Sequence, residues 1–187
     1  VIREHLTPLA CDVSERRPLG SRPEPLVHPT RSRSRSIEVA YQQRWLSQWQ
    51  WLREHPEVDR VWCVDATDVT VQRDPFPTME DGVLYCGWEA RTVDNPWTRK
   101  YLTKGTKQWF TDNGWRMLLN CGVAGSDRAT MMSLCRRMND LAAADRYQEP
   151  LTEMLYFNMA AYAHPKHVAG PQVTNTFKSG VDNGLSW

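Results

Sequence analysis

A short apolar run followed by two aspartates constrains this chain more than any other feature. Residues 61–64 (Val-Trp-Cys-Val) form the run, and Asp65 and Asp68 come directly after it. Upstream, apolar residues recur at helical spacing over residues 37–52, until Pro56 ends the segment. A continuous apolar strand that follows a helix is typical of a central parallel strand covered on both faces. The sequence therefore predicts two carboxylates at the C-terminal end of such a strand.

Further strands and helices alternate along the rest of the chain. Residues 83–88 and 117–121 are predicted to form strands. Ser126 or Asp127 is predicted to cap a helix with an apolar stripe, and a last helix is predicted to begin near Pro150. Strands that alternate with helices indicate an α/β domain with a mainly parallel central sheet flanked by helices.

Residues 1–36 differ in composition from the remainder. They are rich in Pro, Arg and Ser and have no helical or strand period, so we expect a long irregular segment there. Residues 37–187 are predicted to form one domain, because the full 187 residues suffice for one core but hardly for two. Val1 replaces an initiator Met and no apolar leader follows it, so we expect the sequence to lie within a longer natural protein.

Charge, hydropathy and cysteine content narrow the class of protein. The formal net charge of +1 provides no strong electrostatic attraction to nucleic acid or membranes. No apolar run approaches the ~20 residues of a membrane span. Five cysteines, an odd number without CxxC spacing, favour reduced and buried thiols in a cytoplasmic protein. Nine tryptophans suit a core and also a site that stacks on flat or sugar-like rings.

The two aspartates are the strongest candidates for a metal site. Open α/β sheets bind ligands outside the C-terminal ends of their strands, and Asp65 and Asp68 are close enough in sequence to converge on one ion. Ligands that are all oxygen favour Mg²⁺ or Mn²⁺ over zinc, with substrate phosphates and water completing the shell. Taken alone, the pair is better explained by an Asx-type turn that closes the strand.

Three further segments join the acidic one, and together the four resemble a known family. They are residues 64–69 (VDATDV), 85–89 (YCGWE), 119–125 (LNCGVAG) and 153–158 (EMLYFN). They resemble, in this order, the DxxD metal-binding, G-x-E, N-x-G-x-x-G and D-Q-x-x-x-N segments of nucleotide-diphospho-sugar glycosyltransferases with the Rossmann-like GT-A fold. The chain is similar in particular to uncharacterised glycosyltransferase-like proteins of actinobacteria and their phages, which for a phage protein implies the host cytoplasm.

The resemblance implies a role for each matching residue. Asp65 and Asp68 would hold Mn²⁺ or Mg²⁺, with Asp65 also close to the donor nucleotide. Asn120 and Gly122 would line the pocket of the donor sugar. A tight turn between strand and helix explains Gly122 and Gly125 equally well without a ligand.

Two glutamates and a histidine complete the candidates that the resemblance implies. Glu89 and Glu153 would serve as the general base or would orient the sugar, although Glu153 stands where the family has Asp, and a solvent-facing position is an equal alternative. His164 would complete the metal shell, as a C-terminal histidine does in many GT-A enzymes. A surface loop is the simpler explanation for His164, because Pro, Gly and Asn are frequent around it.

Basic residues outside these motifs are weaker candidates. Arg91 begins a basic stretch that includes Trp97 and Lys100, and this stretch would cover the donor diphosphate or receive the acceptor. A solvated loop is the alternative for the whole stretch. Arg44, on the first predicted helix, is expected only to flank the apolar face.

The combined expectation is a metal-dependent glycosyltransferase. It would move a hexose-like sugar from a nucleotide-sugar donor, with a UDP-sugar favoured, to an acceptor that is a protein, a glycan or modified DNA. For a modified base in DNA, Arg31, Arg33 and Arg35 would contact backbone phosphates, although the near-neutral charge argues against a large DNA footprint. The other alternative is a module that binds nucleotide sugars without turnover.

Overall fold

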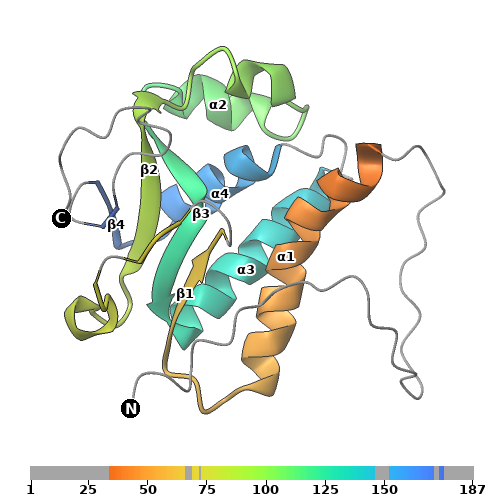
Figure 1. Ribbon diagram of the computed structural model, residues 1–187. Coiled ribbons are helices and arrows are strands. Elements are labelled where there is room, and N and C mark those ends of the chain that lie inside the picture. The colour runs from red at the N-terminus through yellow and green to blue at the C-terminus, as the bar shows by residue number, and fades with distance from the viewer. Residues whose placement is uncertain (1–33, 66–68, 72, 146–151, 171–172, 175–187) are drawn as a thin grey trace, which may run out of the picture.

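The described residues form a β-sheet, and the helices α1, α3 and α4 pack on one of its faces (Figure 1). The computed structural model describes residues 34–65, 69–71, 73–145, 152–170 and 173–174. Its helices and strands are α1 (Ser34–Glu54), β1 (Arg60–Val64), β2 (Leu84–Thr92), α2 (Lys107–Asn113), β3 (Met117–Asp127), α3 (Arg128–Ala144), α4 (Glu153–Tyr162) and β4 (His167–Ala169). Two short 3-10 helices are η2 (Phe76–Thr78) and η3 (Thr98–Tyr101). Asp68, Arg31 and Arg33 lie outside the described residues, as does most of the predicted irregular segment.

The sheet is mixed, with the strand order β1-β3-β2-β4. Both β1 and β2 are antiparallel to β3, and only β4 is parallel to its neighbour β2. The α/β class of the described residues is therefore as predicted, whereas the prediction of a mainly parallel sheet is wrong. The segment after His164, which is rich in Pro, Gly and Asn, contributes the strand β4 to the sheet.

The position of β1 explains the error. β1 pairs with β3 alone and forms one edge of the described sheet. Val61 and Cys63 pack against the helices on one face. On the other face the indole of Trp62 fills the space above Gly125 and donates its N–H to the sulfur of Met79. Both faces of β1 are thus apolar, because helices cover one face and residues near β2 cover the other. An apolar run of this kind does not reveal whether the neighbouring strand is parallel or antiparallel.

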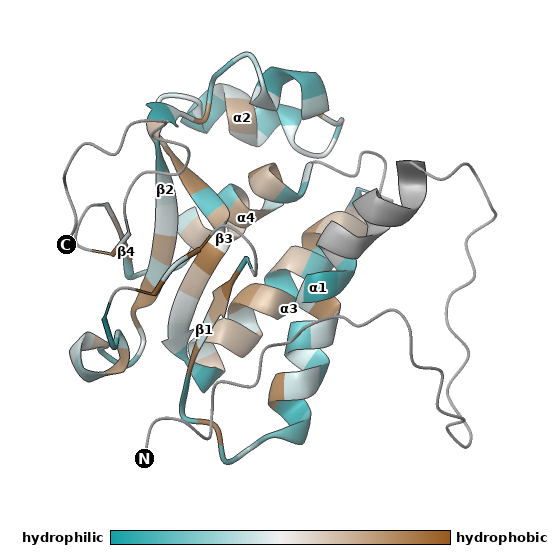
Figure 2. Cartoon of the chain, viewed as in Figure 1, coloured by the Kyte–Doolittle hydropathy of each residue, from teal (hydrophilic) through white to brown (hydrophobic). Residues whose placement is uncertain are grey.

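The core lies between the sheet and its helix layer. Large side chains that are almost fully buried include Trp45 of α1, Met131 of α3 and Phe157 of α4. Trp45 stacks on Phe157 with ring centroids 5.6 Å apart. Burial of each such side chain contributes about 1.5–3 kcal/mol. Figure 2 shows hydrophobic colours on the strands and the facing helices, whereas α2 is mostly hydrophilic.

The start of α3 follows the predicted capping. Asp127 is the N-cap, and its carboxylate accepts a hydrogen bond from the backbone N–H of Thr130 at 2.9 Å. α2 was not predicted, because its seven residues carry too few apolar positions to show a helical period. In the part of the chain that the structure describes, no helix has the length and apolar character needed to cross a membrane.

An irregularity in β3 shapes the end of β1. Cys86 pairs with Ala124, but the next residue of β2, Gly87, pairs with Asn120, so residues 121–123 are additional on β3. Such a bulge redirects side chains and is frequent beside functional sites. Gly122 lies in this bulge, within β3 rather than in the strand-to-helix turn that was one of its two predicted roles.

Candidate functional site

The guanidinium of Arg44 connects the end of β1 to the start of α4. Its Nε donates to Glu153 Oε1 at 2.7 Å, and its Nη1 donates to Asp65 Oδ1 at 2.7 Å. Its Nη2 lies 3.1 Å from both the carbonyl oxygen and the Sγ of Cys121 in the β3 bulge. Trp45 Nε1 also donates to Glu153 Oε1, which holds the carboxylate from a second side. We refer to Arg44, Asp65, Cys121 and Glu153 as the Arg44 cluster.

Gly122 makes room for the carboxylate of Asp65. The backbone N–H of Asp65 donates to the carbonyl oxygen of Gly122 at 2.8 Å, which extends the β1–β3 pairing by one residue. A Cβ at Gly122 would overlap with Asp65 Oδ2 and would lie 2.9 Å from Asn120 Oδ1. Asn120 Oδ1 in turn accepts the N–H of Gly122 at 2.7 Å. The lack of a side chain at Gly122 is therefore a condition for the position of Asp65.

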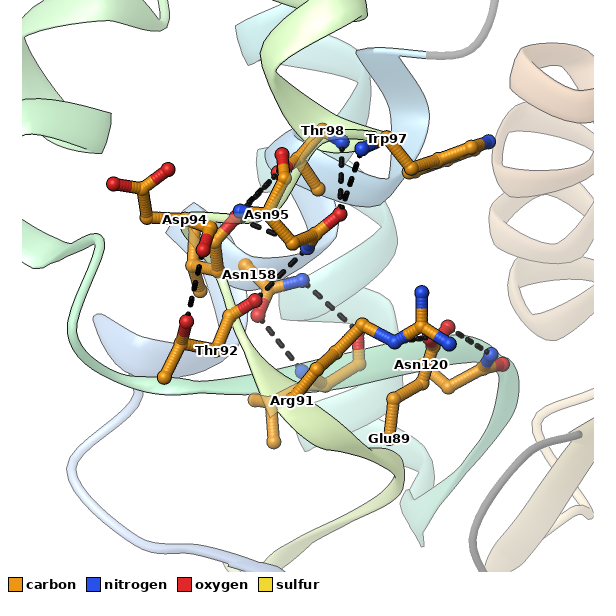
Figure 3. A network of polar contacts seen from close by, with 11 residues as sticks. Glu89, Arg91, Thr92, Asp94, Asn95, Trp97, Thr98, Asn120 and Asn158 are labelled. Carbon is orange, nitrogen blue, oxygen red and sulfur yellow. Dashed lines mark hydrogen bonds and ion pairs between the residues drawn. The ribbon is translucent and has the colours of Figure 1, made fainter. Parts of the chain in front are cut away.

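A second set of polar contacts continues from Asn120 along β2. Asn120 Nδ2 donates to Glu89 Oε1 at 3.0 Å, and Arg91 Nε lies 3.1 Å from Glu89 Oε2. Figure 3 shows Glu89 between Asn120 on one side and the guanidinium of Arg91 on the other. The structure therefore brings together the predicted residues Asp65, Glu89, Asn120, Gly122 and Glu153, together with Arg91.

Asn158 fixes the helix that carries Glu153. Its side chain accepts a hydrogen bond from the backbone N–H of Leu119 at 2.9 Å and donates one to the carbonyl oxygen of Leu119 at 2.9 Å. Asn158 thus makes the two backbone hydrogen bonds to β3 that a neighbouring strand would make. Its Nδ2 also lies 2.7 Å from the carbonyl oxygen of Met154. The asparagine of the EMLYFN segment thus docks α4 on β3 and sets the position of Glu153 at the first turn of the helix.

Exposure differs sharply within the Arg44 cluster. The side chain of Glu153 is 6% exposed, that of Arg44 is 23% exposed and that of Asp65 is 35% exposed. Burial raises the pKa of Glu153 above its usual range, although Arg44 and Trp45 act in the lowering direction. Burial lowers the pKa of Arg44, but Cys121, Glu153 and Asp65 together outweigh it and raise the pKa overall. Arg44 therefore keeps its positive charge, and Asp65 is the carboxylate that faces solvent.

The Arg44 cluster offers hydrogen-bond donors and acceptors next to each other. Nη1 of Arg44 has a second N–H beyond the one that Asp65 accepts, and among the described residues no acceptor is bonded to it. Within the same part of the chain, Asp65 Oδ2 receives no hydrogen bond, while Oδ1 binds Arg44. A hydroxyl group both donates and accepts, so this pairing suits a ligand with several hydroxyl groups.

The described residues supply one carboxylate, that of Asp65, for the predicted metal site. No group of three or more His, Cys, Asp or Glu side chains able to hold an ion is found among them. Asp68, the second predicted ligand, lies outside the described residues. Mg²⁺ is commonly held by one or two carboxylates together with substrate phosphates, so an ion brought by a diphosphate fits this arrangement.

His164 is not part of the Arg44 cluster. It follows the last turn of α4, while Glu153 is in the first, so the two residues are separated by about 16 Å along the helix axis. Its Nδ1 lies 2.7 Å from the carbonyl oxygen of Lys166. The prediction that His164 completes a metal shell with Asp65 therefore finds no support in the geometry.

Arg44 is the residue of the site that the sequence did not reveal. The expectation that it only flanks the apolar face of the first helix is wrong, because its guanidinium contacts three other segments of the chain. A usable signal existed: Arg44 directly precedes the buried Trp45 and so borders the apolar stripe of α1. A charged group so placed needs a partner when the helix packs.

No protein-family model matches the chain, and no curated protein matches it in sequence. The resemblance to GT-A glycosyltransferases therefore stays a prediction based on the four segments and on their arrangement.

Proposed function

We propose that this protein is a metal-dependent glycosyltransferase with a GT-A-like fold that binds a nucleotide-sugar donor at the Arg44 cluster. One observation carries the proposal: a single polar network at the end of β1 joins residues from four separated segments, namely Asp65, Glu89, Asn120, Gly122 and Glu153. The resemblance to GT-A glycosyltransferases implies a part in donor binding or catalysis for each of these four segments.

Arg44 and Asp65 are proposed to bind the donor sugar. The second N–H of Arg44 Nη1 would donate to a sugar hydroxyl, and Asp65 Oδ2 would accept from the same or the adjacent hydroxyl. Glu153 is a positioning residue, because it is almost buried and holds Arg44 in the orientation that reaches Asp65. Arg91 is half exposed beside Glu89 and is proposed to contact the diphosphate.

Mn²⁺ or Mg²⁺ would be held by Asp65 together with Asp68. When bound, the ion would neutralise charge that develops on the diphosphate as it leaves. A UDP-sugar is the favoured donor, and the sugar that it carries is hexose-like.

One observation favours a second candidate, a module that binds nucleotide sugars without turnover. Glu89 and Glu153, the two predicted bases, are both nearly buried and already bonded to other side chains. A general base must reach the hydroxyl that it deprotonates. Donor hydrolysis measured with and without Mn²⁺ separates the two candidates, since only an enzyme releases the nucleoside diphosphate.

Thermal unfolding with a panel of nucleotide sugars and Mn²⁺ tests donor binding. A ligand at one hundred times its Kd stabilises the native state by about 2.7 kcal/mol, so we expect at least one UDP- or GDP-sugar to raise Tm. Asp65→Ala and Asp68→Ala should reduce that rise. Asp140→Ala, which removes a carboxylate that is 71% exposed on α3, should not change it. A panel without any shift in Tm would contradict the proposal.

A further inference from the structure

A tightly bonded turn after β2 presents two aromatic rings. Asn95 Oδ1 accepts the backbone N–H groups of Trp97 and Thr98 at 2.9 and 3.1 Å. Its Nδ2 donates to the carbonyl oxygens of Thr92 and Val93. Figure 3 shows these contacts around Asn95, with the indole of Trp97 extending away from them. The buried amide of Asn95 therefore fixes the backbone from which Trp97 projects.

Trp97 pairs with Tyr101 one turn further along η3. Their ring centroids are 4.9 Å apart with an interplanar angle of 60°, and both side chains are only partly buried. Within the described residues, no hydrogen bond engages the indole N–H of Trp97 or the hydroxyl of Tyr101. The two rings thus combine an apolar surface with polar groups that are available to a ligand.

The backbone of η3 contacts the start of α4, the helix whose first residue is Glu153 of the Arg44 cluster. The carbonyl oxygen of Tyr101 accepts the hydroxyl of Thr152 at 2.8 Å, and Thr152 directly precedes Glu153. In Figure 3 the Trp97 indole and the Arg91 guanidinium extend toward the same side of β2, the side on which α1 lies. A molecule that is bound at the Arg44 cluster and extends along this side would therefore approach the aromatic pair.

We propose that Trp97 and Tyr101 form a platform for a sugar ring of the acceptor, so that the acceptor is a glycoside. This inference rests on the proposed function. A pyranose ring has a face of C–H groups that packs on an aromatic ring, and its hydroxyls bond to polar groups at the ring edge. The two rings carry no charge, and of the basic residues between them Arg99 is paired with Asp94, so the ring faces suit a saccharide and Lys100 is left to bond its hydroxyls.

The chain contains a matched control for this platform. Trp115 is 72% exposed, and its Nε1 is held by the carbonyl oxygen of Asp112 at 3.2 Å. It lies two residues before Met117, the first residue of β3, whereas the Arg44 cluster lies beside the bulge at residues 121–123 further along that strand. Trp115 is thus a fixed and exposed indole away from the Arg44 cluster.

Transfer to simple glycosides tests the platform. With the donor identified by thermal unfolding, transfer to methyl glucosides, galactosides and mannosides is followed by mass spectrometry, and donor hydrolysis is measured without acceptor. We expect transfer to at least one glycoside. Trp97→Ala should raise its KM about tenfold or more, in the range of one aromatic stacking contact. Trp97→Phe should restore part of the affinity, and Trp115→Ala should match the wild type.

The outcomes separate the two proposals. A chain that binds no nucleotide sugar overturns both. A chain that binds and hydrolyses a donor, but transfers to none of the glycosides, overturns the platform alone. The same holds if Trp97→Ala leaves the KM for the glycoside unchanged, or if Trp115→Ala raises it equally. Donor binding without hydrolysis or transfer overturns the platform and favours the module without turnover.

Discussion

Two carboxylates in this protein, Asp65 and Asp145, each lie against a glycine, and they differ in what surrounds them. A Cβ at Gly122 would overlap with the Asp65 carboxylate, and a Cβ at Gly105 would lie 2.7 Å from Asp145 Oδ1. Asp145 is 6% exposed as a residue, whereas the Asp65 side chain is 35% exposed. A glycine thus makes room for a carboxylate in both places, but Asp145 is enclosed and Asp65 faces solvent.

The partners of the two carboxylates differ in charge. Asp145 accepts hydrogen bonds from the hydroxyls of Thr103 and Tyr156 and from the N–H of Gly105, so three neutral donors connect the turn before α2 to α3 and α4. Within the described residues, Asp65 is paired with the cation Arg44 and only through Oδ1. The neutral donors enclose Asp145, so this carboxylate serves to join segments of the chain. Asp65 is held by a cation on one side and can still bind a ligand on the other.

The largest effect is expected from Arg44→Met. This change leaves Glu153 buried without its cation, and breaking a buried ion pair costs about 3–5 kcal/mol. Partial exposure of Arg44 places the expected loss in unfolding free energy at about 3 kcal/mol. Urea unfolding measures it, and the double variant Arg44→Met with Glu153→Leu should recover part of the loss. A loss below about 0.5 kcal/mol would show that the pair does not hold α1 against α4.

Gly105→Ala should have the next largest effect on stability. The added Cβ must displace Asp145 or the turn, and such overpacking costs about 1–3 kcal/mol. The donor-induced rise in Tm should persist, since Asp145 takes no part in the Arg44 cluster. Thermal unfolding with and without donor checks both statements. Loss of the donor effect would contradict the separation of the two regions.

Gly122→Ala should affect stability less and donor binding more. Asp65 is partly exposed and can turn toward solvent, so we expect a loss in unfolding free energy below about 1 kcal/mol. Displacement of Asp65 should weaken donor binding about tenfold, which corresponds to about 1.4 kcal/mol. Calorimetric titration with the donor measures the Kd. A variant that binds like the wild type would remove Asp65 from the donor site.

The pH dependence of stability should show the smallest effect. Burial raises the pKa of Glu153 above its ordinary value of 4.5. Between the unfolded and folded pKa values the native state binds more protons, so the free energy of unfolding falls as pH rises through that window. Relative to Glu153→Gln, the wild type should therefore lose stability as pH rises above 4.5. Urea unfolding across the window measures the difference, and a wild type that gains stability over the variant as pH rises would contradict the assignment.

The sequence predicted what is local in this fold. The apolar run ahead of Asp65, the capping Asp127 and the helical stripes of α1 and α3 are all read within a few residues, and the structure agrees with them. Strand direction could not be predicted from the apolar run, because β1 owes its two apolar faces to segments far along the chain.

Most of the site was predicted from residues in the four segments, and Arg91 from the basic stretch that follows the second of them. Gly122 fits a turn and a bulge equally, and only strand pairing decides between them. Arg44 contacts β3, α4 and the residue that follows β1, so its role depends on packing between elements that are distant in sequence. Such a role is invisible in any short window.

A crystal soaked with a nucleotide sugar and Mn²⁺ would locate both the ion and the donor sugar relative to Asp65 and Arg44. We expect an anomalous manganese peak within coordination distance of the Asp65 carboxylate, with the diphosphate on the ion and sugar hydroxyls bonded to Arg44. Manganese elsewhere, with the Arg44–Asp65 pair unchanged and no sugar beside it, would rule out the Arg44 cluster as the donor site.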